Sequence, residues 1–288
     1  MNSSENAPHS VGVLGGGRMG AGIAHAFLLA GSQVAVVERD AASADAALAR
    51  IAASIRRSVE RDPSLDDAAL HGRVTAGTDA GAFGAVDLVI EAVPEDRALK
   101  DDALARAEAE MSPHATLASN TSSISIDALA ASRSRPERFL GLHFFNPVPA
   151  SALVEIVRGA ATDPAAVASA TGWVAALGKT PIVVSDSPGF ASSRLGVMLG
   201  LEAIRMLEEG VASATDIDAA MTLGYRHPMG PLRTTDVVGL DVRLGIAEEL
   251  ERTLGARFAP PDLLRRMVAE GKLGRKSGEG FYAWNEER

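Results

Sequence analysis

The sequence predicts an α/β fold in which a doubly wound sheet domain is followed by an all-helical domain. Short β-rich apolar runs alternate with helical stretches through the first 185 residues, a pattern typical of a sheet covered by helices on both faces. A glycine-rich turn separates the first strand from the first helix. Pro188 and Gly189 interrupt the alternation, and no convincing strand follows them. We therefore expect a sheet domain over 1–186 and a helical domain over 187–288.

Strands and helices alternate along the first domain in a regular way. The β-rich runs predict strands at 11–14, 33–38, 87–93, 116–119, 138–144, 153–157 and 180–185. Helical stretches are expected at 19–29, 41–60, 96–111 and 162–177. This alternation favours a sheet whose strands are all parallel.

The second domain shows helical periodicity. Helices are expected at 190–209, 214–223, 236–254 and 261–270. The helices expected at 190–209 and 236–254 have more apolar surface than a helical bundle of this size can easily bury. A homodimer that forms through the helical domain is therefore expected.

Composition excludes several classes of function. Apolar residues make up 47% of the 288 residues, and the formal net charge of −9 argues against a generic binder of nucleic acid or acidic membranes. The absence of cysteine excludes disulfides and thiolate chemistry, and fits a cytoplasmic protein. No apolar run approaches the ~18 residues of a membrane span. Residues 1–10 are polar without an apolar core, so a disordered tail is expected rather than a secretion signal.

The first glycine-rich turn has the pattern of a dinucleotide site. Gly15, Gly17 and Gly20 form G-x-G-x-x-G between a strand and a helix; they allow a tight turn, close approach of a pyrophosphate and close helix packing. Glu38 ends the second strand, where a carboxylate can accept from the ribose hydroxyls. The alternative is a tight glycine turn with a purely structural role. The strand before the glycines, the helix after them and the position of Glu38 favour NAD binding. Arg39 leaves NADP open.

The segment GLHFFNPVP at 141–149 holds a histidine within an apolar strand, His143. Glu155 lies in the next apolar run, LVEIV. A histidine with an adjacent carboxylate is suited to proton transfer from an alcohol. The alternatives are a core histidine bonded to a backbone carbonyl and a surface carboxylate at a strand end. A buried carboxylate without a partner is costly, which favours the pair.

Several separate stretches together resemble the L-3-hydroxyacyl-CoA dehydrogenase family, over residues 11–284. The stretches are GVLGGGRMGAGIA, IEAVPED, ASNTSS, GLHFFNPVP, SPGF, HPMGPLRTTDVVGLD and GRKSGEGFY. The resemblance is closest to the short bacterial 3-hydroxybutyryl-CoA dehydrogenase type. It implies a Rossmann-like domain and the NAD-dependent oxidation of (S)-3-hydroxyacyl-CoA to 3-oxoacyl-CoA. In such an enzyme His143 is the catalytic base and Glu155 orients it. The acyl chain is expected in the cleft against the helical domain.

The same resemblance assigns further residues of the sheet domain. Ser122 and Asn146 match positions that bind the substrate's oxygens, and Asn120 matches one near the nicotinamide ribose. Glu95 and Lys100 match positions that line the cofactor and acyl-CoA cleft. A turn or cap role for Ser122, and a solvated helix lysine at 100, are the alternatives.

One position departs from the family pattern. The segment after PGF commonly carries an asparagine that contacts the substrate from the second domain, and this chain has Ser193 there. Serine still donates a hydrogen bond, although its reach is shorter. A simple helix cap is the alternative reading.

The sequence also bears on other classes of function. The remaining histidines form no HExxH pattern or comparable cluster, so no metal is expected. GRKSGEGFY lacks the spacing of a phosphate-binding P-loop and is expected to anchor the helical domain. The rivals are a dehydrogenase of free 3-hydroxy or sugar acids, of the gulonate dehydrogenase type, and a non-catalytic NAD-binding protein. The set of Ser122, His143, Asn146 and Glu155 speaks against the second.

Overall fold

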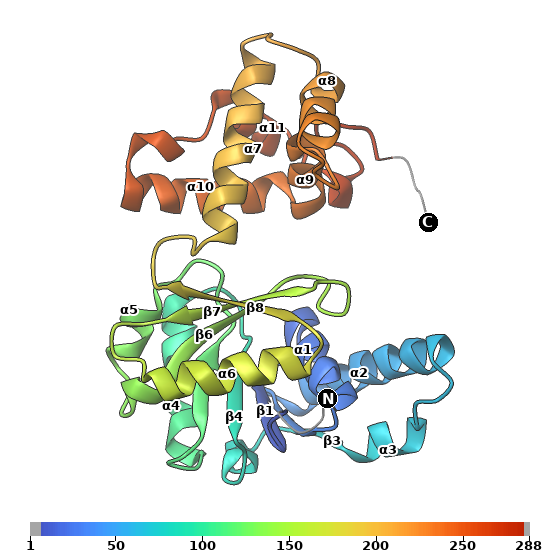
Figure 1. Cartoon of the computed structure of the whole chain (residues 1–288), viewed down its shortest axis with the longest axis vertical. Helices are drawn as coiled ribbons and strands as arrows, with labels where there is room; N and C mark the ends of the chain where they lie inside the picture. The colour runs from blue at the N-terminus through green and yellow to red at the C-terminus, as the bar shows by residue number, and fades with distance from the viewer. Residues whose placement is uncertain (1–6, 285–288) are drawn as a thin grey trace. The chain divides into compact units, whose positions relative to one another are not determined.

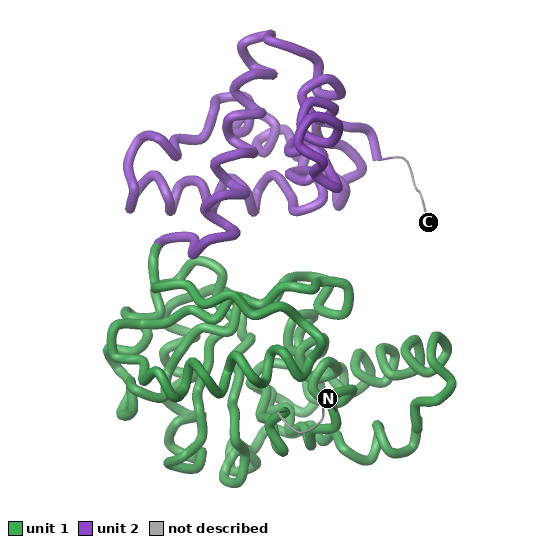
Figure 2. The backbone as a smooth tube through the Cα atoms, viewed as in Figure 1, with its two compact units in different colours: residues 1–187 green, residues 188–288 purple. Residues whose placement is uncertain are grey.

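The computed structural model describes residues 7–284, and Figure 1 shows its helices and strands. The chain divides into two compact units, Met1–Ser187 and Pro188–Arg288 (Figure 2). Unit 1 holds the sheet and unit 2 is helical, so the fold class expected from the sequence is confirmed. The division falls one residue after the expected boundary at 186.

Unit 1 is built around an eight-stranded sheet with the order β3-β2-β1-β4-β5-β6-β7-β8. Its strands are β1 Ser10–Leu14, β2 Gln33–Val37, β3 Val74–Gly77, β4 Leu88–Glu91, β5 Thr116–Ser119, β6 Phe139–Phe144, β7 Leu153–Arg158 and β8 Thr180–Ser185. Its helices are α1 Arg18–Leu29, α2 Ala41–Arg61, α3 Asp67–Gly72, α4 Arg97–Glu110, α5 Ile126–Ala130 and α6 Pro164–Ala176. The order reverses at β1, so the loops after β1 and β4 border the crevice where ligands bind in doubly wound sheets.

The expectation that all strands are parallel is wrong at one junction. β6 and β7 pair antiparallel, whereas β7 and β8 pair parallel. Only residues 145–152 connect β6 to β7. A parallel connection needs a crossover of about a dozen residues or more, so this short segment can join only antiparallel strands. The junction sets His143 directly opposite Glu155.

The alternation of side chains along β6 shows which face of the sheet His143 points to. Leu140, Leu142 and Phe144 of β6 belong to the same apolar cluster as residues of α1 and α6, and α6 lies across the strands at this end of the sheet (Figure 1). Successive strand residues point to opposite faces. His143 therefore points to the face where α5 lies, and Glu155 shares that face through the strand register.

The predicted disordered tail over 1–10 is wrong for its last residues. Residues 1–6 lie outside the described part of the chain. The Ser32 hydroxyl donates to the Pro8 carbonyl at 2.6 Å, and the Gln33 amide donates to the His9 carbonyl. β1 itself begins at Ser10. These backbone pairings give residues 8–10 the order of the sheet that they extend.

Three short elements of unit 1 were not predicted from the sequence. β3 has the sequence VTAG, and α3 and α5 have six and five residues. Each is shorter than the window over which an apolar period becomes visible. β3 forms because it pairs with β2, which is a contact that no local pattern contains.

Unit 2 is a bundle around its own apolar core. Its helices are α7 Ser192–Glu208, α8 Ala214–Ala219, α9 Pro231–Val238, α10 Leu240–Leu254 and α11 Asp262–Ala269. The predicted helix over 236–254 is wrong, because Gly239 has φ 107° and separates α9 from α10. Such a positive φ is open to glycine and breaks a right-handed helix.

The C-terminal segment anchors this bundle, as the sequence predicted. The Asp236 carboxylate accepts from the backbone amides of Phe281 and Tyr282 and from the Trp284 indole, at 2.8–3.0 Å. The Tyr282 hydroxyl donates to Asp218 at 2.8 Å. These buried carboxylates fix the aromatic end of the described chain to α8 and α9.

Candidate active site

The glycine turn between β1 and α1 has the geometry that a pyrophosphate requires. Gly15 has φ 94°. A Cβ on Gly20 would lie 1.8 Å from the Gly15 carbonyl, so only glycine lets the helix approach the turn this closely. No atom lies within 4 Å of the position that a Cβ on Gly17 would take. The backbone at Gly17 is therefore open at the start of α1, where N–H groups favour an anion.

Glu38 lies against this turn. Its Oε1 accepts from the Gly16 amide at 2.7 Å, and its Oε2 accepts from the Arg39 amide at 3.1 Å. The carboxylate is thus fixed at the end of β2, where the ribose of a dinucleotide would lie. The Arg39 side chain is 83% exposed and pairs with Asp40 rather than with the turn. This arrangement fits NAD, because the Glu38 carboxylate would repel the 2′-phosphate that NADP carries on this ribose.

His143 and Glu155 form a buried pair across the β6–β7 junction. The His143 Nδ1 lies 2.7 Å from the Glu155 Oε2, and the two residues are 6% and 0% exposed. A carboxylate can only accept, so Nδ1–H donates to it and the ring takes the tautomer that directs Nε2 away. A histidine held in this way can take a proton and keep its charge stabilised by the carboxylate.

Asn120 connects the end of β5 to the histidine strand. Its Oδ1 accepts from the backbone amide of Phe144 at 2.8 Å. This bond fixes the residue that follows His143 and turns the Asn120 side chain toward the carboxyl end of β6. Asn120 and His143 thus lie at the same end of two neighbouring strands, β5 and β6.

Glu95 is the acceptor of a cluster of donors after β5. Its Oε1 accepts from the Thr121 hydroxyl at 2.6 Å and from the amides of Ser122 and Ser123 at 3.0 Å. Burial by itself would raise the pKa of Glu95, but Lys100 and these donors outweigh it and lower the pKa. The N-cap of α5 is Ser125, so a cap role for Ser122 is wrong. The cluster fixes Ser122 close to the crevice.

Lys100 is fully buried, which rules out the solvated lysine considered as an alternative. Its Nζ lies 2.7 Å from Glu91 and 3.2 Å from Glu95, and it is 1% exposed. Glu91 is 0% exposed and also accepts from the Ser119 hydroxyl at 2.5 Å. Lys100 thus holds two carboxylates together beneath the loop after β4. Glu91 was not among the predicted site residues, although its place at the end of a buried strand was a signal for it.

Asn146 borders an open basic cavity of about 790 Å³ in unit 1. The cavity lies between α1, α2 and the segment 146–150, and Asn146 precedes Pro147 in a cis peptide bond. Four arginines and one glutamate line it: Arg18, Arg50, Arg57, Arg61 and Glu60. These arginines were not among the predicted site residues. Their helical spacing at 50, 57 and 61 was the signal, because it places them on one face.

Ser193 lies in unit 2, at the second residue of α7. The N-cap of this helix is Ala191, so Ser193 is not its cap. The serine is partly buried. Its contact with a substrate stays a prediction.

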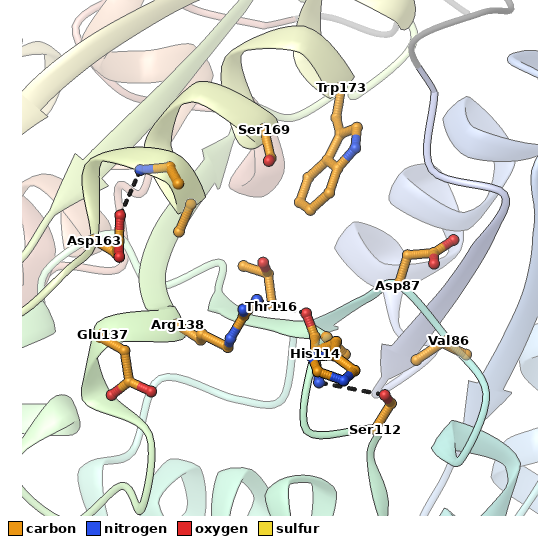
Figure 3. Close-up of a pocket in the computed structure, with 13 residues that line it drawn as sticks. Val86, Asp87, Ser112, His114, Thr116, Glu137, Arg138, Asp163, Ser169 and Trp173 are labelled. Atoms are coloured by element: carbon orange, nitrogen blue, oxygen red, sulfur yellow. Dashed lines mark hydrogen bonds between the residues drawn. The ribbon is translucent and has the colours of Figure 1, made fainter.

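A second cavity of about 500 Å³ lies at the opposite edge of the sheet (Figure 3). Its lining residues precede or begin β4, β5 and β6, with Trp173 and Ser169 from α6 above them. His114 and Arg138 belong to this cavity. The carboxyl ends of the strands, which carry the glycine turn and His143, lie at the other edge, so this cavity is separate from the candidate site.

Two absences bear on the site. Within residues 7–284, no group of three or more histidine or acidic side chains is arranged to hold a metal ion. Among those same residues, no helix combines the length and apolarity needed to cross a membrane.

Comparisons with known proteins cover almost the whole chain. Residues 10–187 match the family described as "3-hydroxyacyl-CoA dehydrogenase, NAD binding domain", and residues 189–284 match its C-terminal domain. A 3-hydroxybutyryl-CoA dehydrogenase of Mycobacterium tuberculosis H37Rv is 45% identical over 290 residues, which cover 97% of this chain and 99% of the relative. The mitochondrial hydroxyacyl-coenzyme A dehydrogenase of Sus scrofa is 38% identical, with 95% and 90% covered.

A solved structure of a relative is similar to this chain in fold as well as in sequence. The (S)-3-hydroxybutyryl-CoA dehydrogenase of Ralstonia eutropha superposes with a TM-score of 0.92 at 40% identity. The match covers 97% of this chain and 100% of that one. Both units of this chain therefore have counterparts in one solved relative.

Proposed function

The chain belongs to the 3-hydroxyacyl-CoA dehydrogenase family, and from this premise we propose that it oxidises (S)-3-hydroxybutyryl-CoA and related short-chain thioesters with NAD. One observation carries the proposal. The buried His143–Glu155 pair stands at the carboxyl edge of the same sheet that presents the glycine turn and Glu38. An acid–base group and a dinucleotide turn at one edge are what the oxidation of an alcohol requires.

His143 is proposed to move the proton. In oxidation its Nε2 takes the proton of the substrate's 3-hydroxyl, and in reduction it returns that proton to the 3-oxo oxygen. Glu155 receives the Nδ1–H at 2.7 Å and stabilises the imidazolium that forms. Bound NAD supplies the hydride acceptor. The residues at the turn fit it, because Gly17 leaves the backbone open and Glu38 is already fixed beside the turn.

Three polar side chains are proposed to position the substrate and the cofactor. Ser122 and Asn146 would bind oxygens of the acyl group, and Asn120 would lie near the nicotinamide ribose. The bonds of Ser122 to Glu95 and of Asn120 to Phe144 support this, since they hold both side chains in place before any ligand binds. Such prior order lowers the entropy that binding costs.

The basic cavity beside Asn146 is proposed to take the phosphates of coenzyme A. Four arginines and one glutamate line it, so it carries an excess of positive charge in a protein whose net charge is −9. Arg50 is engaged by the Gly16 carbonyl at 3.2 Å. Arg57 and Arg61 are mostly exposed on the same helix face, and these two are the residues we assign to the phosphates.

Replacing Arg57 and Arg61 together by glutamine is expected to raise the KM for acetoacetyl-CoA by about tenfold or more at low salt. Each charge-assisted hydrogen bond contributes about 1.5–3 kcal/mol, less where solvent reaches it. The turnover number should change little, because the phosphates lie away from the reacting carbon. Steady-state assays of NADH oxidation measure both constants.

Arg56→Gln is the matched control for this double variant. Arg56 is exposed on the same helix but does not line the cavity. Its KM should stay at the value of the unmodified protein. An unchanged KM in the double variant would remove the coenzyme A phosphates from this cavity.

The function is tested by comparing two substrates in one NADH absorbance assay. Acetoacetyl-CoA should be reduced with a kcat/KM at least about a hundredfold above that of free acetoacetate, because only the thioester can use the basic cavity. Faster turnover of a free 3-oxo acid would instead identify a dehydrogenase of free hydroxy acids. NADH binding without turnover of either compound would contradict an enzymatic role.

We propose that the chain forms a homodimer through unit 2. Among the described residues, ten large apolar side chains are exposed, and seven of them belong to this unit: Leu195, Val211, Leu223, Tyr225, Met229, Val238 and Val242. Apolar groups gathered on one unit favour burial against a second copy. Sedimentation equilibrium should therefore give about twice the chain mass of 29.8 kDa.

Leu223→Glu tests this interface, since Leu223 is 82% exposed. A charge placed inside an apolar interface should shift the mass toward that of one chain. Leu29→Glu is the control, because Leu29 is 42% exposed in unit 1 and should leave the mass unchanged. A single-chain mass for the unmodified protein would contradict the dimer.

The cytoplasm and short-chain or fatty-acyl-CoA metabolism are the setting that we propose for this reaction. The substrate class and NAD support it, as does a chain without cysteine, which suits a reducing compartment.

A further inference from the structure

The segment 146–152, which joins β6 to β7, has few backbone donors of its own. Pro147 and Pro149 carry no N–H group. No backbone amide within residues 7–284 donates to the carbonyl of Val148 or to the carbonyl of Ser151. A hydrogen bond to either carbonyl therefore has to come from a side chain or from solvent.

Lys179 supplies both of these hydrogen bonds. Its Nζ lies 2.6 Å from the carbonyl oxygen of Val148 and 2.5 Å from that of Ser151. A hydrogen bond from a charged donor is about twice as strong as one between neutral groups. One ammonium group thus fixes two points of the segment at once.

The position of Lys179 is set by the turn between α6 and β8. Gly178 follows the C-cap of α6 and has φ 70°, a conformation that is open to glycine. On the other side of the lysine, the Thr180 amide donates to the Ala152 carbonyl at 2.6 Å. Lys179 therefore stands on a fixed turn beside the end of segment 146–152.

The antiparallel junction of β6 and β7 brings this turn to the edge of the sheet that carries the candidate site. β6 ends one residue after His143, and β7 begins at the same edge because it runs in the opposite direction. β8 is parallel to β7, so its first residue lies at this edge as well. Lys179, which precedes β8, is therefore placed where the chain leaves β6 and reaches Asn146.

A second attachment holds the segment against α1. Val148 is 2% exposed and belongs to the apolar cluster that includes residues of α1. A Cβ on Gly22 would lie 3.0 Å from the Val148 side chain, so glycine at this place lets the segment lie close to the helix. Residues 146–150 also form one wall of the basic cavity, and the exposed Asn146 is the polar side chain of that wall.

We propose that Lys179 is a positioning residue, which holds the segment 146–152 so that the Asn146 amide meets the acyl group of the substrate. This inference rests on the proposed function, in which Asn146 binds an oxygen of that group. Lys179 acts through the two carbonyls rather than on the substrate. Loss of both bonds frees the segment, and a displacement of about 1 Å at a substrate contact can lower the rate by about 10²-fold.

The test is a double-mutant cycle of Lys179→Met and Asn146→Ala, with acetoacetyl-CoA in the NADH assay. Lys179→Met should lower kcat/KM by about tenfold or more, and Asn146→Ala should lower it by at least as much. The variant that carries both changes should fall no more than about threefold below Asn146→Ala, because the lysine acts through the asparagine. The Kd for NADH, from a fluorescence titration, should stay within about twofold in all three variants.

Arg158→Met is the matched control. Arg158 is an exposed cation at the other end of β7, where its side chain donates to the Ser185 hydroxyl at 3.3 Å. Its kcat/KM should stay within about twofold of the original value. Lys179→Arg should keep most of the activity that the methionine variant loses, since a guanidinium has enough donors for both carbonyls. Thermal melting shows whether each variant folds, and Lys179→Gln takes the place of a methionine variant that does not fold.

Three results would overturn the inference while leaving the dehydrogenase function intact. An unchanged kcat/KM in Lys179→Met would mean that the two hydrogen bonds are dispensable. Losses that multiply in the doubly changed variant would show that the lysine acts independently of Asn146. A Kd for NADH that rises together with the loss of activity would assign Lys179 a structural role in unit 1. Absence of turnover in the unmodified protein would instead reject the proposed function, and this inference with it.

Discussion

Replacing His143 by glutamine is expected to lower the turnover number for acetoacetyl-CoA by about 10²–10⁴-fold. Glutamine keeps a polar group of similar length opposite Glu155 but cannot carry the proton. General acid–base catalysis by a positioned side chain contributes a factor of this size. Steady-state oxidation of NADH at saturating substrate measures the change.

NADH affinity should not change in the same variant. The glycine turn connects β1 to α1 and Glu38 follows β2, away from the strands that carry His143 and Glu155, so a fluorescence titration should give the original Kd within about twofold. His114→Gln is the matched control, because His114 is exposed at the opposite edge of the sheet and should keep full activity. Turnover retained by His143→Gln would reject the histidine as the proton carrier.

Exchange of Lys100 for methionine should lower the free energy of unfolding by about 3–5 kcal/mol. The ion pair of Lys100 with Glu91 is almost fully buried, at 1% and 0% exposure. Removing Lys100 leaves the buried Glu91 carboxylate without its counterion, and losses of this size follow from such changes. Urea unfolding, followed by far-UV circular dichroism, measures the difference.

Arg106→Met is the control for this change. Arg106 is exposed on the same helix, α4, so its loss should cost no more than about 1 kcal/mol. A loss below about 1 kcal/mol in Lys100→Met would mean that the buried pair is solvated or dispensable, which would contradict its place beneath the loop after β4.

Local patterns predicted most of the elements because each pattern is a property of neighbouring residues. The apolar runs at 116–119 and 180–185 became β5 and β8 at the predicted residues. The glycine spacing predicted the turn before α1, since steric limits on backbone conformation and on helix approach act within a few residues. The His143–Glu155 contact was predicted in the same way, from two adjacent apolar runs.

What the sequence left undetermined depends on contacts between distant segments. The direction of β7 follows from the length of one connection rather than from any strand pattern. The burial of Lys100 depends on Glu91, which lies nine residues earlier in another element. Side-chain chemistry of this kind follows from tertiary packing, which periodicity does not encode.

The most direct test is the rate of the first turnover when His143→Gln, saturated with NADH, is mixed rapidly with acetoacetyl-CoA. The first turnover excludes product release, which often limits steady-state rates. The His143–Glu155 pair predicts that NADH consumption in this variant is slower by at least about a hundredfold, with (S)-3-hydroxybutyryl-CoA as the product of the unmodified protein. A first turnover as fast as that of the unmodified protein would contradict proton transfer by His143.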